Sequence, residues 1–259
     1  RRRTGLLYPA VSSSGRNGFD WRQPIYLNLA PNYDATLTPR FMSKRGLQLG
    51  GEFRYLTETG RGEFDAAFLP SDDLTERERA EEIFEGVPED NRRRNDRGFF
   101  RFIGSQNVGA SWQARSHLVW ISDTRYLDDA NNTLNGAASS FVQSDIGIYG
   151  RGRSWEAGFM ADHWQLADYT LRDTFLPFNR LPRAYASWDQ RFASVFTAGV
   201  DAEAVRFDHP EYTGGSRVDL KPYVSLPLEG ASWFLTPTLA WRYTAYGLEG
   251  DAQDRARSY

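Results

Sequence analysis

The chain has 259 residues, of which 15% are aromatic and 23 are glycine, and it contains no cysteine. This composition favours strands and tight turns, and the lack of cysteine excludes a disulfide framework and a thiolate metal site. The 31 basic and 34 acidic residues give a net charge of −3, which does not indicate nucleic-acid binding, because that usually needs a basic patch or stripe.

The first residues, Arg1-Arg2-Arg3-Thr4-Gly5, have no apolar run behind them, so we do not expect them to form a signal peptide. The chain has no run of about 18 apolar residues, so helical membrane spans are not expected. It stops at Tyr259 without a closing element. We therefore expect an excerpt of a longer protein.

Alternation of apolar and polar residues is the dominant pattern along the chain, as expected for strands with two unlike faces. Near residue 50, Leu47 and Phe53 occupy odd positions while Glu52 and Arg54 occupy even ones. The clearest alternating segments are, in chain order, 45–55, 63–68, 110–120, 155–162, 196–204, 217–226 and 232–243. Two segments, 97–107 and 139–150, alternate less regularly.

These segments predict an all-β protein, an antiparallel transmembrane β-barrel with about 13 strands of roughly 8–14 residues. We expect a partial barrel here, a curved open sheet with an unpaired edge at both ends. The segment 73–85 is the best helical candidate, but it has almost no apolar stripe, so we expect an exposed loop there.

The lengths of the connections follow a parity. Long polar connections, 70–96, 122–138 and 165–183, follow the fifth, seventh and ninth predicted strands, whereas the connections after even-numbered strands are short. Long loops therefore gather at one end of the sheet and tight turns at the other. Outer-membrane barrels have this asymmetry, and a soluble sandwich would have little reason to keep it.

A long stretch near the start carries a family signature. Residues 24–40 read PIYLNLAPNYDATLTPR and are followed by MSKRGL at 42–47. Further support lies at 52–56 (EFRYL), 69–72 (LPSD), 220–222 (LKP) and 226–228 (LPL). The chain resembles the beginning of the barrel in the LptD family of lipopolysaccharide-assembly (organic-solvent-tolerance) proteins, essentially throughout and most sharply over 1–72.

The resemblance implies that residues 1–259 are one partial domain, the first half of a barrel in the Gram-negative outer membrane. In that family a periplasmic jelly-roll domain, which we do not expect within residues 1–259, receives lipopolysaccharide from the periplasmic Lpt bridge. The lipoprotein LptE plugs the lumen, and lipopolysaccharide leaves through a lateral seam between first and last strands. The implied function is insertion of lipopolysaccharide into the outer leaflet, with lipopolysaccharide, LptE, the Lpt bridge and outer-membrane lipid as partners and no nucleic acid.

Two prolines in the first predicted hairpin are candidates for that seam. Pro9 and Pro24 fall nearly opposite each other if the chain turns around 14–17. Proline donates no backbone hydrogen bond and is normally confined to sheet edges or bulges. The resemblance places gate prolines at these two positions, with Tyr8 and Ile25 beside them; the alternative is an ordinary edge-strand or strand-start proline.

Polar residues on the other face of the predicted strands would form a wetted lumen wall. The candidates are Glu52, Arg54, Asp65, Asp201, Glu203, Arg217, Asp219 and Lys221. Such a wall could contact the sugars of lipopolysaccharide while its acyl chains enter the bilayer. General solvation of a barrel interior is the simpler interpretation, and we favour it over specific sugar recognition.

No catalytic constellation is found, so we expect neither an enzyme nor a cofactor or metal site. His117, His163 and His209 lack metal-ligand spacing. The acidic pairs at 72–73 and 128–129 could bind divalent cations, but solvated loop acids are commoner. Two other functions stay open from the residues alone: a diffusion porin or other pore, and a soluble secreted β-protein that binds carbohydrate.

Overall fold

A computed structural model describes residues 2–73, 75–89, 92–130, 140–193, 195–249 and 255–258. The chain divides into two compact units. Unit 1 comprises Arg1–Gln106, Ser116–Ser144 and Trp164–Leu176, and unit 2 comprises Asn107–Arg115, Asp145–His163 and Pro177–Tyr259. Strands β8 to β11 contribute residues to both units, and each unit is described by itself.

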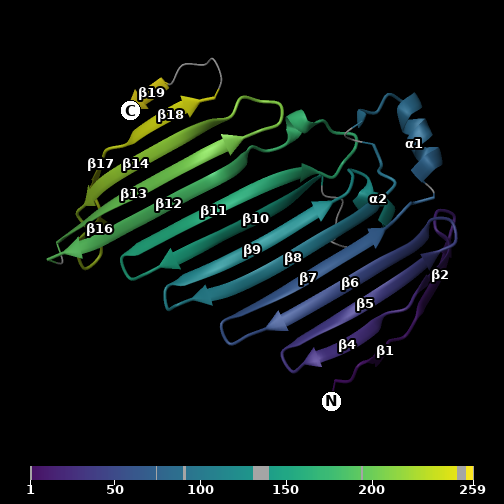
Figure 1. The fold of residues 1–259 in the computed structure, drawn as a ribbon. Helices are drawn as coiled ribbons and strands as arrows, with labels where there is room; N and C mark the ends of the chain where they lie inside the picture. Colours follow the sequence, from purple (N-terminus) through teal and green to yellow (C-terminus); the bar gives the residue numbers. More distant parts are fainter. Residues whose placement is uncertain are drawn as a thin grey trace. The chain divides into compact units, whose positions relative to one another are not determined.

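Unit 1 contains the first hairpins and both α-helices (Figure 1). Its elements are β1 (Gly5–Leu6), β2 (Ala10–Ser14), β3 (Gly18–Arg22), β4 (Ile25–Ala30), β5 (Tyr33–Met42), β6 (Gly46–Leu56), β7 (Gly60–Leu69), α1 (Thr75–Phe84) and α2 (Tyr126–Ala130), with most of β8 (Arg97–Val108) and β9 (Trp112–Ile121). The strand pairings from β2 to β8 are antiparallel.

Unit 2 contains the later strands. They are most of β10 (Phe141–Arg151) and β11 (Trp155–Leu166), then β12 (Asn179–Phe192), β13 (Phe196–Asp208), β14 (Gly215–Ser225), β15 (Leu228–Glu229), β16 (Phe234–Leu235), β17 (Thr238–Ala240), β18 (Tyr243–Leu248) and β19 (Arg255–Ser258). The 3₁₀ turn η2 (Asp173–Phe175) precedes β12 and belongs to unit 1. The pairings from β11 to β14 and on to β18 and β19 are antiparallel.

The predicted all-β antiparallel class is confirmed. Among the described residues, seventeen strands belong to one sheet, and β15 pairs with β16 in a separate ribbon. Some of these strands are pieces of one predicted strand, so the seventeen strands agree with the prediction of about 13. Among the described residues, no helix has both the length and the apolar character needed to cross a membrane.

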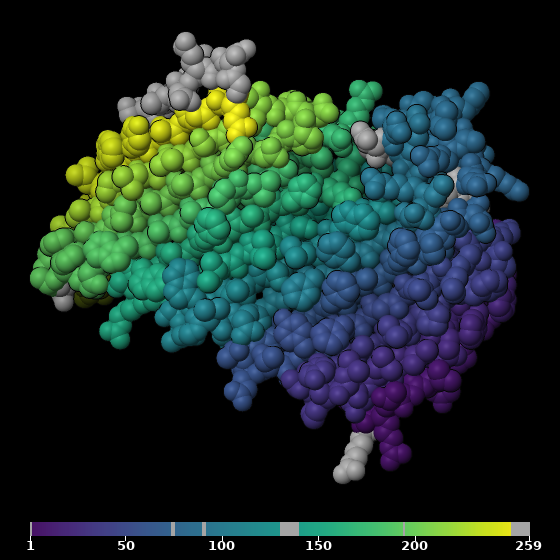
Figure 2. Space-filling view, viewed as in Figure 1, coloured from purple at the N-terminus to yellow at the C-terminus, as the bar shows by residue number. Residues whose placement is uncertain are grey.

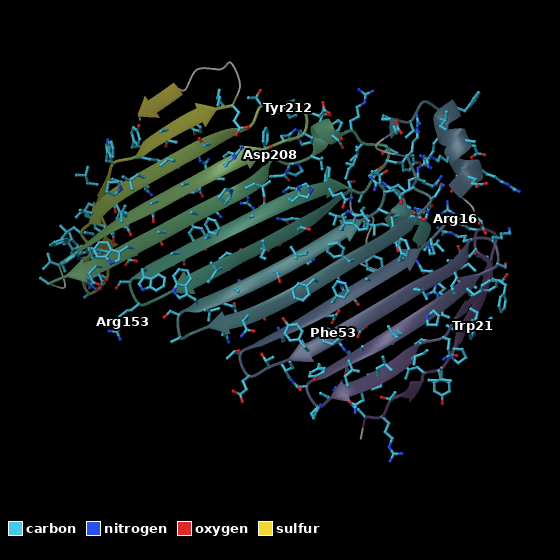
Figure 3. The ribbon with its side chains drawn as sticks, in the orientation of Figure 1. Arg16, Trp21, Phe53, Arg153, Asp208 and Tyr212 are labelled. Carbon is cyan, nitrogen blue, oxygen red and sulfur yellow. The ribbon has the colours of Figure 1, made fainter. Side chains whose placement is uncertain are left out.

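Cross-strand register in unit 1 separates two faces. On one face Leu37 lies opposite Gly51, and Phe53 lies opposite Phe64. On the other, Thr36 lies opposite Glu52. Aliphatic and aromatic side chains of the first face stay exposed, as for Phe68 at 50%. Phe53 is among those exposed aromatic residues (Figure 3).

Among the described residues of unit 1, the side chains of this apolar face stay exposed, as Leu37 and Phe41 do. The buried hydrophobic cluster of unit 1 is small and lies where its long loops meet the sheet; its members are Val119, Ile121, Tyr126, Val142 and Ala167. On the face of unit 1 seen in Figure 2, side chains of the strands form the surface directly. The sheet therefore differs from a soluble sandwich, whose two apolar faces pack together.

The expected loop at 73–85 is wrong, because α1 spans Thr75–Phe84. This helix is held by charge instead of by an apolar stripe. Glu78 and Glu82 contact Arg93 at 3.0 and 3.1 Å. They lie four residues apart and so share one face of the helix.

The prediction of one strand over 232–243, with a short connection before it, is also wrong. The structure divides this segment into β16, β17 and the start of β18, and β16 pairs with β15. Pro237 lies between β16 and β17. Because proline cannot donate to a ladder, a break at this position is the expected outcome.

Candidate functional site: a proline-broken hairpin and a polar sheet face

Pro9 and Pro24 both fall in interruptions of the first hairpin. Pro9 lies between β1 and β2, and Pro24 lies between β3 and β4. The Leu7 N–H donates to the Pro24 carbonyl at 2.9 Å, so the two interruptions face each other as the sequence predicted. Tyr8, beside Pro9, is 96% exposed, whereas Ile25 is half-buried opposite Leu6.

The first strand also has one residue more than its partner at this point. Leu6 pairs with Ile25, and Ala10 pairs with Arg22. Three residues, 7–9, therefore stand opposite two, 23–24, which is the arrangement of a β-bulge. The extra residue and the missing proline donors together weaken the ladder between the first two strands.

A third proline was missed as a candidate. Pro39 on β5 accepts a hydrogen bond from the Gln23 N–H at 3.0 Å and, having no N–H, cannot return one. Pro9, Pro24 and Pro39 follow one another at equal intervals in the sequence. The first strands and their turns have similar lengths. Equal spacing in the sequence could therefore have predicted that the three prolines lie at a similar level on neighbouring strands.

The predicted wall residues of unit 1 share one face. Glu52 lies directly opposite Asp65, a placement that would be destabilising for two carboxylates alone. Arginines on the same face compensate: Arg54 Nε is 3.0 Å from Glu52 Oε1, and Arg101 Nη2 is 2.6 Å from Asp65 Oδ2. Arg54 also donates to Asp34 at 2.9 Å.

The predicted wall residues of unit 2 repeat this arrangement. Glu203 lies opposite Asp219, and Asp201 lies opposite Lys221. Glu203 accepts hydrogen bonds from Arg183, at 2.7 Å, and from Arg217. Asp219 accepts from Arg242 at 2.7 Å and from Thr244 at 3.2 Å. The structure thus brings together the predicted wall residues within each unit. It adds three arginines that were not among the predicted wall residues: Arg101, Arg183 and Arg242.

A second polar region at the loop end of unit 1 was not anticipated. We call it the loop-end charge cluster; its members are Arg16, Arg45, Asp72, Glu78, Glu82, Arg93, Arg97, Asp123 and Asp129. Arg97, only 1% exposed, donates to Asp123 at 2.9 Å and to Asp129 at 2.8 Å. Arg16 reaches Asp129 at 2.8 Å from the first hairpin turn, and lies at the same end of the unit as α1 (Figure 3).

The interpretation of Asp72 and Asp129 as solvated or cation-binding loop acids is wrong. Both are buried, and both are ion-paired with arginines. Burial by itself opposes ionisation of Asp129, but Arg97 and Arg93 outweigh it and hold the pKa of this carboxyl below its ordinary value. Burial raises the pKa of the neighbouring Tyr126 to about 12.

The described residues offer no group of three or more His, Asp or Glu that could hold a metal ion. His209 instead caps a loop: its Nδ1 accepts from the N–H groups of Glu211 and Tyr212 at 3.0 and 3.1 Å. Its ring packs 4.8 Å from that of Phe178 and 4.6 Å from that of Tyr212. This histidine serves packing and loop geometry.

Comparison with known proteins decides the family. A family model described as LPS transport system D, or LptD, matches residues 95–258. The chain belongs to the LptD family. The matched region lies outside residues 1–72, where the sequence signature is sharpest, so the two observations support the family from different parts of the chain.

The similar curated proteins carry the same family name. LPS-assembly protein LptD of Xanthomonas campestris pv. campestris (strain 8004) is 50% identical over 286 residues, covering 99% of this chain and 33% of that protein. The LptD of Xylella fastidiosa (strain Temecula1) is 47% identical over 270 residues, covering 96% and 32%. The chain thus spans about a third of the length of these LptD relatives. The names of these relatives describe LPS assembly and not a porin or a carbohydrate-binding protein.

Proposed function

We propose that residues 1–259 are the first half of an LptD barrel in the Gram-negative outer membrane, and that the complete protein inserts lipopolysaccharide into the outer leaflet. The chain acts as part of a conduit and carries no catalytic step. The observation that carries this proposal is the division of each unit's strands into one exposed apolar face and one ion-paired polar face.

The two faces match the two solvents that a barrel wall separates. Exposed residues such as Leu49, Phe68 and Phe159 would each gain about 25 cal/mol per Å² of apolar surface removed from water on entering lipid. On the opposite face, Glu52, Asp65 and Glu203 are held by arginines. Charged groups are costly in hydrocarbon, so that face is the one that would line the wetted lumen.

The proline-broken hairpin is the proposed lateral gate, with Pro9, Pro24, Tyr8 and Ile25 as its residues. Opening a barrel sideways means giving up ladder hydrogen bonds along one seam. Each bond that is already missing lowers that cost by about 0.5–1.5 kcal/mol net in water, and by more in hydrocarbon. Acyl chains could then pass into the bilayer at the seam while sugars stay beside the polar wall.

The polar wall is proposed to solvate the passing sugars and not to recognise one of them. Its carboxylates, such as Asp219 and Glu203, already accept several bonds from arginine. Groups so fully engaged leave little capacity for a specific ligand. As in the family, the proposed partners of the complete protein are lipopolysaccharide, the lipoprotein LptE as lumen plug, and the periplasmic Lpt bridge through a jelly-roll domain.

The test is site-specific photocross-linking in the complete protein in cells that make lipopolysaccharide. A photoreactive residue at Tyr8 or Ile25 should capture lipopolysaccharide. Position Phe68 on the apolar face serves as the control for contact with bulk membrane lipid, and position Glu52 as the control for the wall. Capture at Glu52 but at neither Tyr8 nor Ile25 would contradict the gate, and capture at none of them would contradict the transport proposal.

A further inference from the structure

The seam holds a glutamine where the surrounding face is apolar. Continuing the register of β3 and β4 against β5, Trp21 lies opposite Phe41 and Ile25 opposite Leu37, with Gln23 between them on the same face. Phe41 and Leu37 are exposed apolar residues. A primary amide in a row that faces hydrocarbon is unfavourable unless it is hydrogen-bonded, so its partners are informative.

Those partners compensate for a missing backbone donor. In an antiparallel hydrogen-bonded pair, two residues exchange both N–H···O bonds. The Leu7 N–H donates to the Pro24 carbonyl at 2.9 Å, but Pro24 has no N–H with which to donate to Leu7 in return. The Gln23 side chain donates from Nε2 to that Leu7 carbonyl at 2.9 Å, and lies 3.2 Å from the Pro24 carbonyl.

Gln23 is also tied to the third strand through its main chain. Its N–H donates to the Pro39 carbonyl at 3.0 Å. Pro39 has no N–H with which to donate back to Gln23. A backbone donor is therefore missing on both sides of the second strand here: at Pro24 toward the first strand and at Pro39 toward the third. The side chain of Gln23 therefore joins the first strand to the second. Beside Gln23 the second strand is itself held to the third by a single backbone hydrogen bond.

We propose that Gln23 is a positioning residue of the seam: its side-chain amide replaces the backbone donor that Pro24 lacks, and so sets how firmly the first strand is held. This inference deepens the proposed gate and rests on it for its functional meaning. A backbone bond would be fixed by the chain, whereas a side-chain bond can be released by a rotamer change without moving the second strand.

The experiment measures amide hydrogen exchange of Leu7 in the complete protein, inserted in a membrane. Gln23→Leu keeps much of the side-chain volume and removes the donor, so the exchange rate of the Leu7 amide should rise about three- to tenfold, the change expected for one lost hydrogen bond. Gln113→Leu, which alters a side chain bonded to Asn107 in unit 2, is the matched control and should leave Leu7 unchanged.

A double-mutant cycle separates replacement of the donor from general support of the hairpin. Pro24→Ala restores the backbone N–H, so adding Gln23→Leu to it should change Leu7 exchange by less than about twofold, since coupled sites are non-additive. Equal effects of Gln23→Leu with and without Pro24→Ala would overturn the proposal, as would unchanged Leu7 exchange in the single variant.

Two further outcomes keep the test decisive. If Gln23→Leu does not insert into the membrane, Gln23→Asn replaces it, because it keeps an amide on a shorter side chain. Faster Leu7 exchange in Gln23→Asn, which disappears when Pro24→Ala is added, supports the proposal. Unchanged Leu7 exchange in Gln23→Asn overturns it. If Leu7 exchange responds as expected but Tyr8 and Ile25 fail to capture lipopolysaccharide, the role of Gln23 in the hairpin stands and the gate fails.

Discussion

In unit 1 the loop-end charge cluster gives each buried charge several partners, whereas the first strands lack backbone donors at Pro9, Pro24 and, on β5, Pro39. Arg97 contacts Asp72, Asp123 and Asp129. At the seam, Leu7 has one backbone bond to Pro24 and one side-chain bond from Gln23. A buried ion network is costly to disturb, while a sparse ladder is easy to open. We therefore expect the contacts of the charge cluster to resist opening more strongly than the pairing of the first strand.

The largest effect should come from breaking the cluster at its centre. Arg97→Leu leaves Asp123 and Asp129 buried without their main cation, which costs about 3–5 kcal/mol. The connection 70–96 should then be cleaved by protease much faster in the folded protein. Arg77→Leu, which changes an exposed arginine of α1, should leave cleavage unchanged; equal cleavage in both variants would show that the cluster does not hold the loop.

Acid should loosen the same cluster. The pKa of Asp129 is lowered in the folded state, so its contribution to stability is complete above the ordinary carboxyl pKa of about 4 and is lost as pH falls through the lowered value. Exchange of the Asp72 amide, which donates to Asn95, should accelerate below about pH 4 after correction for intrinsic rates. Asp129→Asn should remove much of this pH dependence. An unaltered dependence of Asp72 exchange on pH would contradict the role of Asp129 in the cluster.

A smaller effect, opposite in sign, is expected at the seam. Pro24→Ala restores a backbone donor facing Leu7 and should strengthen the ladder by about 0.5–1.5 kcal/mol. Cross-linking of lipopolysaccharide at Tyr8 should fall several-fold while the amount of assembled protein stays the same. A rise in cross-linking would mean that the seam is not opened by loss of these bonds.

The smallest effect should come from the polar wall. Glu203→Gln weakens contacts to two partly exposed arginines, and such pairs contribute about 0–1 kcal/mol. The midpoint of urea unfolding in detergent should shift slightly. Asp201→Asn, whose contact with Lys221 is 3.9 Å, is the matched control and should not shift it measurably; a larger shift from Asp201 would reverse the ranking of these sites.

Much of the fold follows from local pattern. The period-two alternation of residues such as Phe53 and Arg54 fixes which face each occupies, because a strand turns its side chains to opposite sides at every step. The placement of Glu52 with Asp65, and of Asp201 with Lys221, on one face was predictable for that reason. Pro9 and Pro24 were found because proline removes a donor wherever it falls.

What only the tertiary structure decided is which distant groups meet. The helix α1 lacks an apolar stripe, and its acidic face is stabilised by arginines from elsewhere in the chain, which no local pattern contains. The burial of Asp72 and Asp129 was likewise invisible, since the same residues in an open loop would be solvated. Gln23 looks like a misplaced polar residue in sequence; its proposed role depends on the strand pairing that places the Leu7 carbonyl beside Pro24. Local steric rules act within a few residues, whereas charge pairing and hydrogen-bond completion depend on partners that only folding brings near.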